Sequence, residues 1–296
     1  MKNKLQKAIA LCIVIITSVT FYTHAKKTVN QSEINAFFSG ITYYDCEETL
    51  EKIMDIIEKK EKGMYLRFGD GDVLLATGRR DINQKFSEKV SAELQEAFAL
   101  EDKNILKTLP LNCDGYGACS SEMCRGMKIP FRTCKYILNK AKKVWKNMGD
   151  IYTPWLLSYY ATYYPEICIQ FFEFLKDHNC FMFVGNQKAP TDIIHLLLGK
   201  QCRIISTPTK HSYDHIDRIE QECLDTIPND GNYRIIVTAM GCAGRALQKR
   251  LWKKLDNVFL FDFGSLIDAL CGWNTRPWIR RSRFDGKQFL NKMRKN

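Results

Sequence analysis

The sequence predicts an α/β fold: a Rossmann-like parallel sheet with helices on both faces, preceded by an N-terminal hydrophobic segment. Short runs of continuously apolar residues recur along the chain, and Cys180–Gly185 is one example. Between these runs lie longer stretches in which apolar residues follow helical spacing. Buried strands that alternate with amphipathic helices are typical of a parallel sheet covered on both faces.

The elements can be assigned in order along the chain. The first helix is expected at residues 47–60, because Asp45 is a suitable N-cap and Leu50, Ile53 and Ile57 share one face. A strand at 63–68 follows it. The remaining expected helices are 87–100, 136–148, 165–176, 191–198, 213–224 and 243–255. The remaining expected strands are 104–111, 180–185, 201–206, 234–239 and 258–262.

Length and charge limit the classes of protein to consider. A chain of 296 residues with 45% hydrophobic and 26% charged residues suits one large globular domain. Of the net charge of +11, +7 lies in residues 276–296, which hold eight Lys or Arg against one Asp. We therefore expect no nucleic-acid partner, an α/β domain at 45–278 and a basic tail at 279–296. Such a tail is either solvated or in contact with an anionic membrane surface or an acidic partner.

The N-terminal segment indicates delivery to a membrane. Lys2, Lys4 and Lys7 precede an uncharged, mostly apolar run from Ala8 to Tyr22. This pattern predicts a signal anchor or signal peptide at residues 1–27, followed by a short stem at 28–44. We expect a single-pass membrane protein whose domain is lumenal or extracytoplasmic (Golgi- or ER-like in a eukaryotic cell), or a secreted protein if the segment is cleaved.

The first strand ends in an unusual turn, Arg67-Phe68-Gly69-Asp70-Gly71-Asp72. Gly69 and Gly71 let the backbone approach a ligand closely. Asp70 and Asp72 can share a divalent cation, Mn²⁺ or Mg²⁺, through their carboxylate oxygens. Arg67 can donate two hydrogen bonds to a phosphate. The turn thus predicts a metal–diphosphate site at a strand's carboxyl end; the alternative is a glycine-closed loop in which Arg67 pairs with one carboxylate.

Polar residues also follow the strands of the second half. Gly241-Cys242-Ala243-Gly244 opens a helix with free N–H groups, as in a phosphate-binding turn. Arg245 lies in the same helix and is a further cation that could bind phosphate. The other candidates at strand ends are Asn186, Lys188, Lys210, His211 and Ser212. Each of the lysines could equally be solvated surface, and His211 could equally be a structural histidine.

These motifs resemble a known family. The segment Leu66–Asp72 resembles the Arg-Phe-Gly-Asp-Gly-Glu motif of glycosyltransferases of the GT-D fold. Pro208-x-x-His211-Ser212-Tyr213, the Met240-Gly241 turn and Asp262-Phe263-Gly264 are similar to later segments of that family. The resemblance spans about residues 45–275. It implies a Rossmann-like fold, a nucleotide-sugar donor and a divalent metal on an Asp-x-Glu pair, where this chain has the shorter Asp72.

The predicted function is therefore glycosyl transfer from a nucleotide-sugar donor to a hydroxyl of a glycan or protein acceptor, assisted by Mn²⁺ or Mg²⁺. The metal ligands would be Asp70 and Asp72, and the catalytic residues would be Asp72 with His211 or Asp268 as general base. The residues expected to bind the donor are Arg67, Gly69, Gly71, Asn186, Lys188, Lys210, Ser212 and Gly241.

The acceptor would enter beside residues 112–134, where Trp155, Tyr159 and Tyr160 could stack on a sugar. Two alternatives remain open. One is a membrane-tethered, non-catalytic nucleotide-sugar or glycan-binding protein with a degenerate site. The other is a metal-dependent hydrolase of phosphate esters, which would need no acceptor.

Overall fold

A computed structural model describes residues 31–81, 83–113, 129–145 and 148–295. The chain divides into two compact units, Met1–Phe37 and Phe38–Asn296. In the first unit the structure describes only helix α2 (Gln31–Phe37). The predicted N-terminal segment at 1–27 lies outside the described residues. Within the described part of the chain, no helix combines the length and apolar character needed to cross a membrane.

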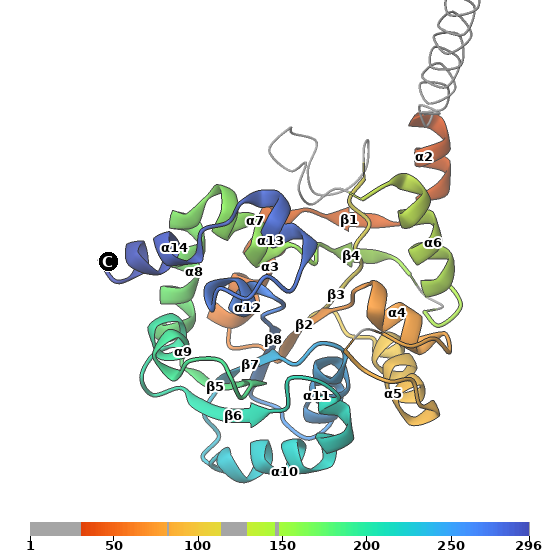
Figure 1. Ribbon diagram of the computed structural model, residues 1–296. Coiled ribbons are helices and arrows are strands. Elements are labelled where there is room, and N and C mark those ends of the chain that lie inside the picture. The colour runs from red at the N-terminus through yellow and green to blue at the C-terminus, as the bar shows by residue number, and fades with distance from the viewer. Residues whose placement is uncertain (1–30, 82, 114–128, 146–147, 296) are drawn as a thin grey trace, which may run out of the picture. The chain divides into compact units, whose positions relative to one another are not determined.

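The second unit is built on one sheet of eight parallel strands (Figure 1). Its spatial order is β1-β4-β3-β2-β8-β7-β5-β6, so β2 and β8 lie at the centre. The predicted α/β class with a parallel sheet is confirmed. The strands are β1 (Thr42–Tyr44), β2 (Gly63–Arg67), β3 (Ile105–Thr108), β4 (Asp150–Tyr152), β5 (Cys180–Asn186), β6 (Arg203–Thr207), β7 (Arg234–Ala239) and β8 (Val258–Asp262).

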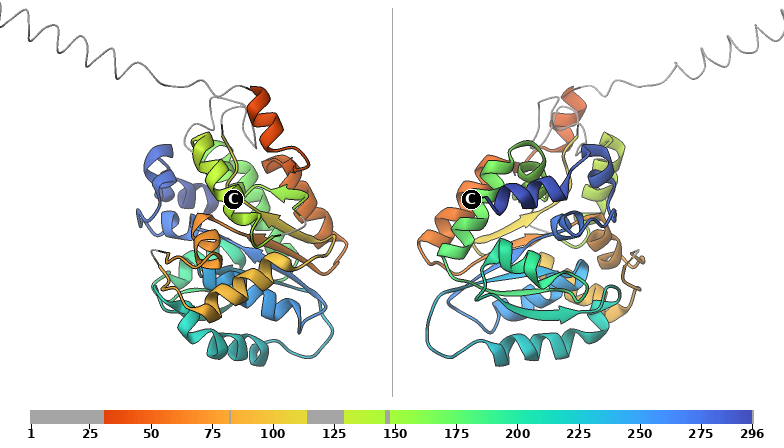
Figure 2. Two further views of the ribbon diagram at one scale, coloured as in Figure 1. Left: turned by 90° about the vertical axis from the view of Figure 1, so that its right-hand side faces the viewer. Right: turned by 60° about the vertical axis from the view of Figure 1, so that its left-hand side comes forward.

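Helices cover both faces of this sheet (Figures 1 and 2). On one face α3, α7, α8, α9, α12 and α14 share a hydrophobic core with strand residues such as Phe183 and Phe261. On the other face α4, α5, α10 and α11 pack together. The helices of this unit are α3 (Cys46–Glu58), α4 (Asp70–Ala76), α5 (Glu88–Ala99), α6 (Phe131–Ala141), α7 (Leu156–Tyr163), α8 (Pro165–Asp177), α9 (Thr191–Leu198), the 3₁₀ turn η2 (Ser212–His215), α10 (Ile216–Thr226), α11 (Cys242–Trp252), α12 (Leu266–Leu270), α13 (Pro277–Ser282) and α14 (Gly286–Met293).

Local sequence explains how β2 is placed and which way its side chains point. Asp45 caps α3 by accepting hydrogen bonds from the backbone of Glu47 and Glu48, as its position before the apolar face predicts. Gly63 opens β2 where an added Cβ would lie 2.5 Å from the Ile56 side chain. Because strand side chains alternate, Arg67 points to the face opposite Phe68, whose ring stacks on Phe98 at 3.7 Å.

The structure adds elements at both margins of the predicted domain. Strands β1 and β4 pair at one edge of the sheet, and β1 lies within the predicted stem at 28–44. Residues 279–296, set apart above as a basic tail, form most of α13 and all of α14. α14 buries Phe289, Leu290 and Met293 in the core of the domain. The first expected turn is also different, since α4 already begins at Asp70.

Candidate active site

The carboxyl ends of β2 and β8 form the point where the chain connections diverge. The two strands are neighbours, with Tyr65 opposite Phe261. After β2 the chain enters α4, which packs with α5 on one face, whereas after β8 it enters α12, whose core lies on the other face. Diverging connections leave a crevice between neighbouring strand ends, and open α/β sheets bind ligands in such crevices. The fold therefore singles out this position.

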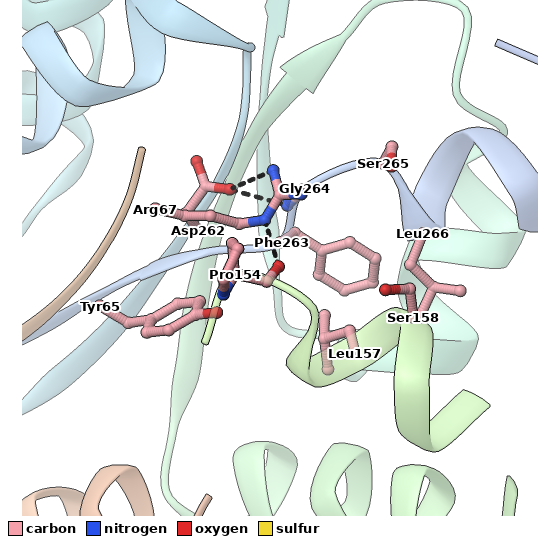
Figure 3. A pocket seen from close by; sticks show the side chains of 10 residues that line it. All are labelled: Tyr65, Arg67, Pro154, Leu157, Ser158, Asp262, Phe263, Gly264, Ser265 and Leu266. Carbon is pink, nitrogen blue, oxygen red and sulfur yellow. Dashed lines mark hydrogen bonds and ion pairs between the residues drawn. The ribbon is translucent and has the colours of Figure 1, made fainter. Parts of the chain in front are cut away.

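A small cavity opens at this crevice, as Figure 3 shows. Its volume of about 10 Å³ is enough for about one water molecule. A diphosphate is far larger, so binding one would require the walls to move apart. The cavity is lined by Tyr65, Arg67, Pro154, Leu157, Ser158, Asp262, Phe263, Gly264, Ser265 and Leu266.

Arg67 is the cationic side chain of this lining. Its Nε donates a hydrogen bond of 2.6 Å to the carbonyl oxygen of Pro154, and its Nη1 lies 4.0 Å from Oδ1 of Asp262. The side chain is 23% exposed, so the guanidinium is fixed without being sealed off. It lies against Gly264, where a Cβ would stand 3.0 Å from the Arg67 Cζ. Burial lowers the pKa of Arg67 and Asp262 opposes the shift, but a guanidinium stays charged.

Behind Arg67 a buried chain of charges crosses to the other face of the sheet. Asp262 accepts a hydrogen bond of 2.5 Å from Nη1 of Arg245, and its Oδ1 accepts another from the backbone N–H of Gly264. Nε of Arg245 lies 3.6 Å from Oδ1 of Asp72. Burial raises the pKa of both aspartates, while the Arg245 guanidinium opposes that rise. Four alternating charges therefore compensate one another, as buried charges must.

The two aspartates of the first turn have opposite surroundings. Asp70 is exposed, and its Oδ1 accepts a hydrogen bond of 3.0 Å from the N–H of Gly71. Asp72 is 6% exposed, its Oδ2 accepts the N–H of Gly69 at 2.7 Å, and its Oδ1 faces Arg245 without a hydrogen-bond donor. At Gly71 a Cβ would lie 2.5 Å from the Asp81 carboxylate, so that carboxylate would have to shift to admit any larger residue.

The surroundings of Asp70 and Asp72 decide which of them could hold the predicted metal ion. Within residues 31–81, 83–113, 129–145 and 148–295, no group of three or more His, Cys, Asp or Glu could hold an ion. Asp70 fits an ion that keeps several waters and binds through one or two carboxylates, as Mg²⁺ does. Asp72 could bind the ion only if Arg245 moved away, because the Asp72 carboxylate is buried against that guanidinium. The ligand pair Asp70 and Asp72 stays a prediction.

The remaining predicted donor ligands lie at other strand ends and do not line the cavity. Asn186 at the end of β5 accepts hydrogen bonds from the Lys188 N–H and the Thr209 hydroxyl, so it joins two loops. Lys188 and Lys210 are exposed. Gly241, with φ of +58°, precedes α11, and its carbonyl oxygen accepts a hydrogen bond from Arg245 at 2.6 Å.

The residues predicted as general bases also make local contacts. His211 has φ of +57°, and its Nδ1 accepts a hydrogen bond from the Lys85 N–H at 3.4 Å. The Ser212 hydroxyl donates to the Pro208 carbonyl oxygen at 2.7 Å. Asp268 in α12 accepts a hydrogen bond of 2.6 Å from the Thr275 hydroxyl, and burial raises its pKa. Their roles as bases stay predictions.

The structure reveals partners that the strand-end analysis missed. Asp262 ends an apolar strand, so its position alone could have identified it as a site residue. Ser158 and Ser265 line the cavity but carry no motif in the sequence. Of the aromatic residues expected to stack on a sugar, Tyr160 is 7% exposed and packs against Tyr159. Most of the predicted acceptor loop, residues 114–128, lies outside the described part of the chain.

Comparisons with known proteins agree with this fold. The family model described as glycosyltransferase GT-D fold matches residues 65–288, so the chain belongs to the GT-D fold family of glycosyltransferases. No curated protein sequence matches this chain.

Three solved structures share the fold. A domain of unknown function called DUF1792, in selenomethionine-substituted form, is 20% identical with a TM-score of 0.58, covering 82% of this chain and 85% of its own. A protein described as a new glycosyltransferase (DUF1792) from Streptococcus sanguinis is 20% identical with a TM-score of 0.56, covering 79% and 84%. A third, described as a DUF1792 domain with a distinct glycosyltransferase fold, is 19% identical with a TM-score of 0.55, covering 78% and 81%.

Proposed function

We propose that the protein transfers a sugar from a nucleotide-sugar donor to a hydroxyl acceptor, and that the donor diphosphate binds at the carboxyl ends of β2 and β8. Arg67 carries this proposal. Its guanidinium is held by Pro154 and Asp262 at the point where the connections diverge, yet it remains partly exposed. A fixed, partly desolvated cation at this position suits the diphosphate of a donor. Membership of the GT-D family supports the proposal of glycosyl transfer.

In such a transfer the bond from the anomeric carbon to the diphosphate oxygen breaks, and a bond to the acceptor oxygen forms. Negative charge develops on the leaving nucleoside diphosphate, and a positioned cation stabilises the transition state in which it develops. Arg67 would supply that charge once the walls of the cavity have moved apart to admit the diphosphate, and Pro154 and Asp262 fix the direction of its guanidinium beforehand. The acceptor proton would pass to a general base, for which Asp268 and His211 remain the predicted groups.

A divalent ion would add further positive charge at the same phosphates. Asp70 is the residue we propose to hold it, since its carboxylate is exposed at the start of α4. Asp72 would then act by fixing the turn, through the Gly69 N–H and Arg245. Titration of the protein with Mn²⁺ in the absence of donor checks this division of roles.

Calorimetric titration with a panel of nucleoside diphosphates tests the donor site. Wild type is expected to bind at least one of them, and Arg67→Met should weaken that binding about tenfold or more, because a charged hydrogen bond to phosphate is lost. Lys200→Met, which removes an exposed charge beyond α9, is the matched control. Equal affinity in wild type and Arg67→Met would contradict the proposed site.

Turnover separates the three classes of function. A glycosyltransferase releases nucleoside diphosphate faster when an acceptor is present. A hydrolase releases it equally without acceptor, and a binding protein releases none while still binding the nucleotide.

The predicted membrane segment remains part of the proposal. The Lys-flanked apolar run at 8–22 supports delivery of the domain to a membrane. Cell fractionation of the full-length protein beside residues 28–296 provides the test. Full-length protein that stays in the soluble fraction with an intact Met1 would contradict it.

A further inference from the structure

The C-terminal helices present a dense group of positive charges. We call this group the cationic face; it consists of Arg280, Arg281, Arg283, Lys287, Arg294 and Lys295, all of them exposed. The residues belong to α13, to α14 and to the segments that follow each helix. The stretch 276–296 carries a net charge of +7, so most of the protein's total of +11 is gathered here.

The cationic face is held in a fixed place on the domain. Nε1 of Trp278 in α13 donates a hydrogen bond of 2.8 Å to the Ser265 hydroxyl. Gly286 at the start of α14 lies so close to α12 that a Cβ would stand 2.6 Å from the Ala269 carbonyl oxygen. The apolar side of α14 is buried in the core of this unit. These charges are therefore presented on packed helices, which costs less ordering entropy on binding than a flexible tail would.

The charges of the cationic face have no acidic partners within the described part of the chain. The only ion pair of α14 there joins the neighbouring Lys292 to Glu166 at 2.7 Å. Arg280 and Arg294 donate weak hydrogen bonds of 3.4 and 3.3 Å to the neutral acceptors Asn274 and Asn291. The carboxylate of Asp285 is used in capping α14. Six exposed like charges thus lie on α13, α14 and the segments that follow them, with Asp285 as the acidic residue of that stretch, and the excess of positive charge raises the local potential for anions.

The cationic face adjoins the crevice at β2 and β8. Ser265, the hydrogen-bond partner of Trp278, lines the cavity beside Arg67. Arg276, the residue just before α13, is close enough to Arg67 and Asp268 for its charge to act on the pKa of both, although burial sets the direction of the shift in each, lowering the pKa of Arg67 and raising that of Asp268. Figure 1 shows α13 beside α12, which follows β8 directly. A ligand on the cationic face would therefore have a short route to the crevice.

We infer that the cationic face binds the acceptor, and that this acceptor is a polyanionic glycan whose repeating units carry carboxylate or phosphate groups. The inference rests on the proposed glycosyl transfer. Four of the six side chains are arginines, whose planar guanidinium forms paired hydrogen bonds to such groups. An extended polymer would place several anionic units along α13 and α14 while its terminal hydroxyl reaches the crevice.

Binding measurements test the inference without any turnover. The probes are a fluorescent oligogalacturonate and an uncharged maltodextrin of the same length, followed by fluorescence anisotropy. Wild type should bind the acidic probe, more weakly as salt is added, and should not bind the neutral one. The double variant Arg280→Gln/Arg281→Gln should lose about five- to tenfold in affinity. Lys200→Gln/Arg203→Gln, an equal charge change at exposed positions around β6, should bind as wild type does.

Three outcomes would overturn the inference. One is equal binding of the two glycans. Another is an equal loss of affinity in the two double variants, which would indicate net charge alone. The third is binding to phosphatidylglycerol-containing vesicles without binding to the acidic glycan, which would identify a lipid surface as the partner.

Nucleoside diphosphate titration separates this inference from the donor site. The variant Arg280→Gln/Arg281→Gln should bind the nucleotide as wild type does, because neither residue lines the cavity. Loss of nucleotide binding in Arg67→Met with retained glycan binding would support both sites independently. Glycan binding by a protein that binds no nucleotide would retain the cationic face and reject the proposed transfer.

Discussion

Asp70 and Asp72 are two residues apart and have the same chemistry, yet the structure gives them different tasks. Asp70 lies in water at the first position of α4, where a carboxylate also favours the helix dipole. Asp72 is buried between the Gly69 N–H and Arg245. A carboxylate in that position stabilises the fold, because its removal would leave a buried guanidinium with one partner fewer.

Substitution by Asn should separate these tasks. Asp72→Asn is expected to lower the free energy of unfolding by about 2 kcal/mol or more, since a buried charge pair is lost. Asp70→Asn should change it by no more than about 0.5 kcal/mol but should abolish Mn²⁺ binding. Urea denaturation and Mn²⁺ titration of both variants check this, and an Asp72→Asn protein as stable as wild type would contradict it.

Lys107 illustrates burial of a charge away from the crevice. Its Nζ donates a hydrogen bond of 3.0 Å to the Phe98 carbonyl oxygen and lies 4.4 Å from the centroid of a Trp145 ring. Burial lowers the pKa of Lys107 from 10.5 to about 8. Between these values the unfolded chain holds more protons than the folded one, so stability contributed at this residue rises with pH.

The variant Lys107→Met removes that dependence. From pH 8 to about 10.5 the stability of wild type relative to the variant should rise, by at most about 3 kcal/mol. Urea denaturation of both proteins at the two ends of this range measures the change. A constant difference would show that Lys107 titrates as it does in water.

At the level of elements, the site depends on two turns that follow neighbouring strands. The turn after β2 begins α4, and the turn after β8 passes through Gly264 with φ of +65°. Glycine suits position 264 for two reasons: the left-handed backbone disfavours a Cβ, and the Arg67 guanidinium lies about where that Cβ would stand, 3.0 Å from it at Cζ. The β8 turn therefore sets the position of the donor-binding cation.

Gly264→Ala should affect both stability and binding. The backbone strain costs about 1–2 kcal/mol, and the new Cβ would push Arg67 out of place. Gly272→Ala is the matched control, since Gly272 has φ of +76° with no atom near its missing Cβ. Both variants should lose stability through the backbone strain, Gly264→Ala the more because Arg67 is displaced, and only Gly264→Ala should weaken nucleoside diphosphate binding. Equal affinities would show that Arg67 does not bind the donor.

At the level of the second compact unit, Phe38–Asn296, the fold joins its two ends to the sheet. Near its beginning β1 extends the sheet by pairing with β4, and at its end α14 contributes to the core. Composition placed the domain between 45 and 278 because the last residues are rich in Lys and Arg. Two of those charges, Lys287 and Lys292, lie in α14, whose apolar residues Phe289, Leu290 and Met293 are buried.

Removal of residues 279–296 should therefore be severe. It takes Phe289, Leu290 and Met293 from the core, and each such side chain contributes about 2–4 kcal/mol, against a total stability of about 5–15 kcal/mol. We expect the shortened chain to unfold at much lower denaturant or to aggregate. Lys287→Gln/Lys295→Gln, which changes only exposed charges, should unfold as wild type does. A shortened chain with an unchanged midpoint would show that α14 is dispensable.

The sequence determined what depends on neighbouring residues. Apolar runs and helical spacing established the parallel α/β sheet, Asp45 marked the start of α3, and the Arg67–Asp72 turn identified the central strand end. Strands β1 and β4, the outermost pair on one side of the sheet, could not be predicted in this way, since three residues each are too few for a burial pattern. A burial pattern predicts that a side chain lies in the core, but it does not predict which side chain it contacts there.

Only the tertiary structure decided those partners. Arg67 donates a hydrogen bond to the carbonyl oxygen of Pro154, 87 residues away. Asp72, which the sequence predicts as a metal ligand, lies instead against the buried guanidinium of Arg245. The first pairing arises because the segment after β4 lies beside the end of β2, and the second because α11 lies beside the start of α4. Each brings together distant parts of the chain, and a formal charge carries no information about its distant partner. The same holds for α13 and α14, whose charges in sequence suggest a tail and whose packing makes them a surface of the domain.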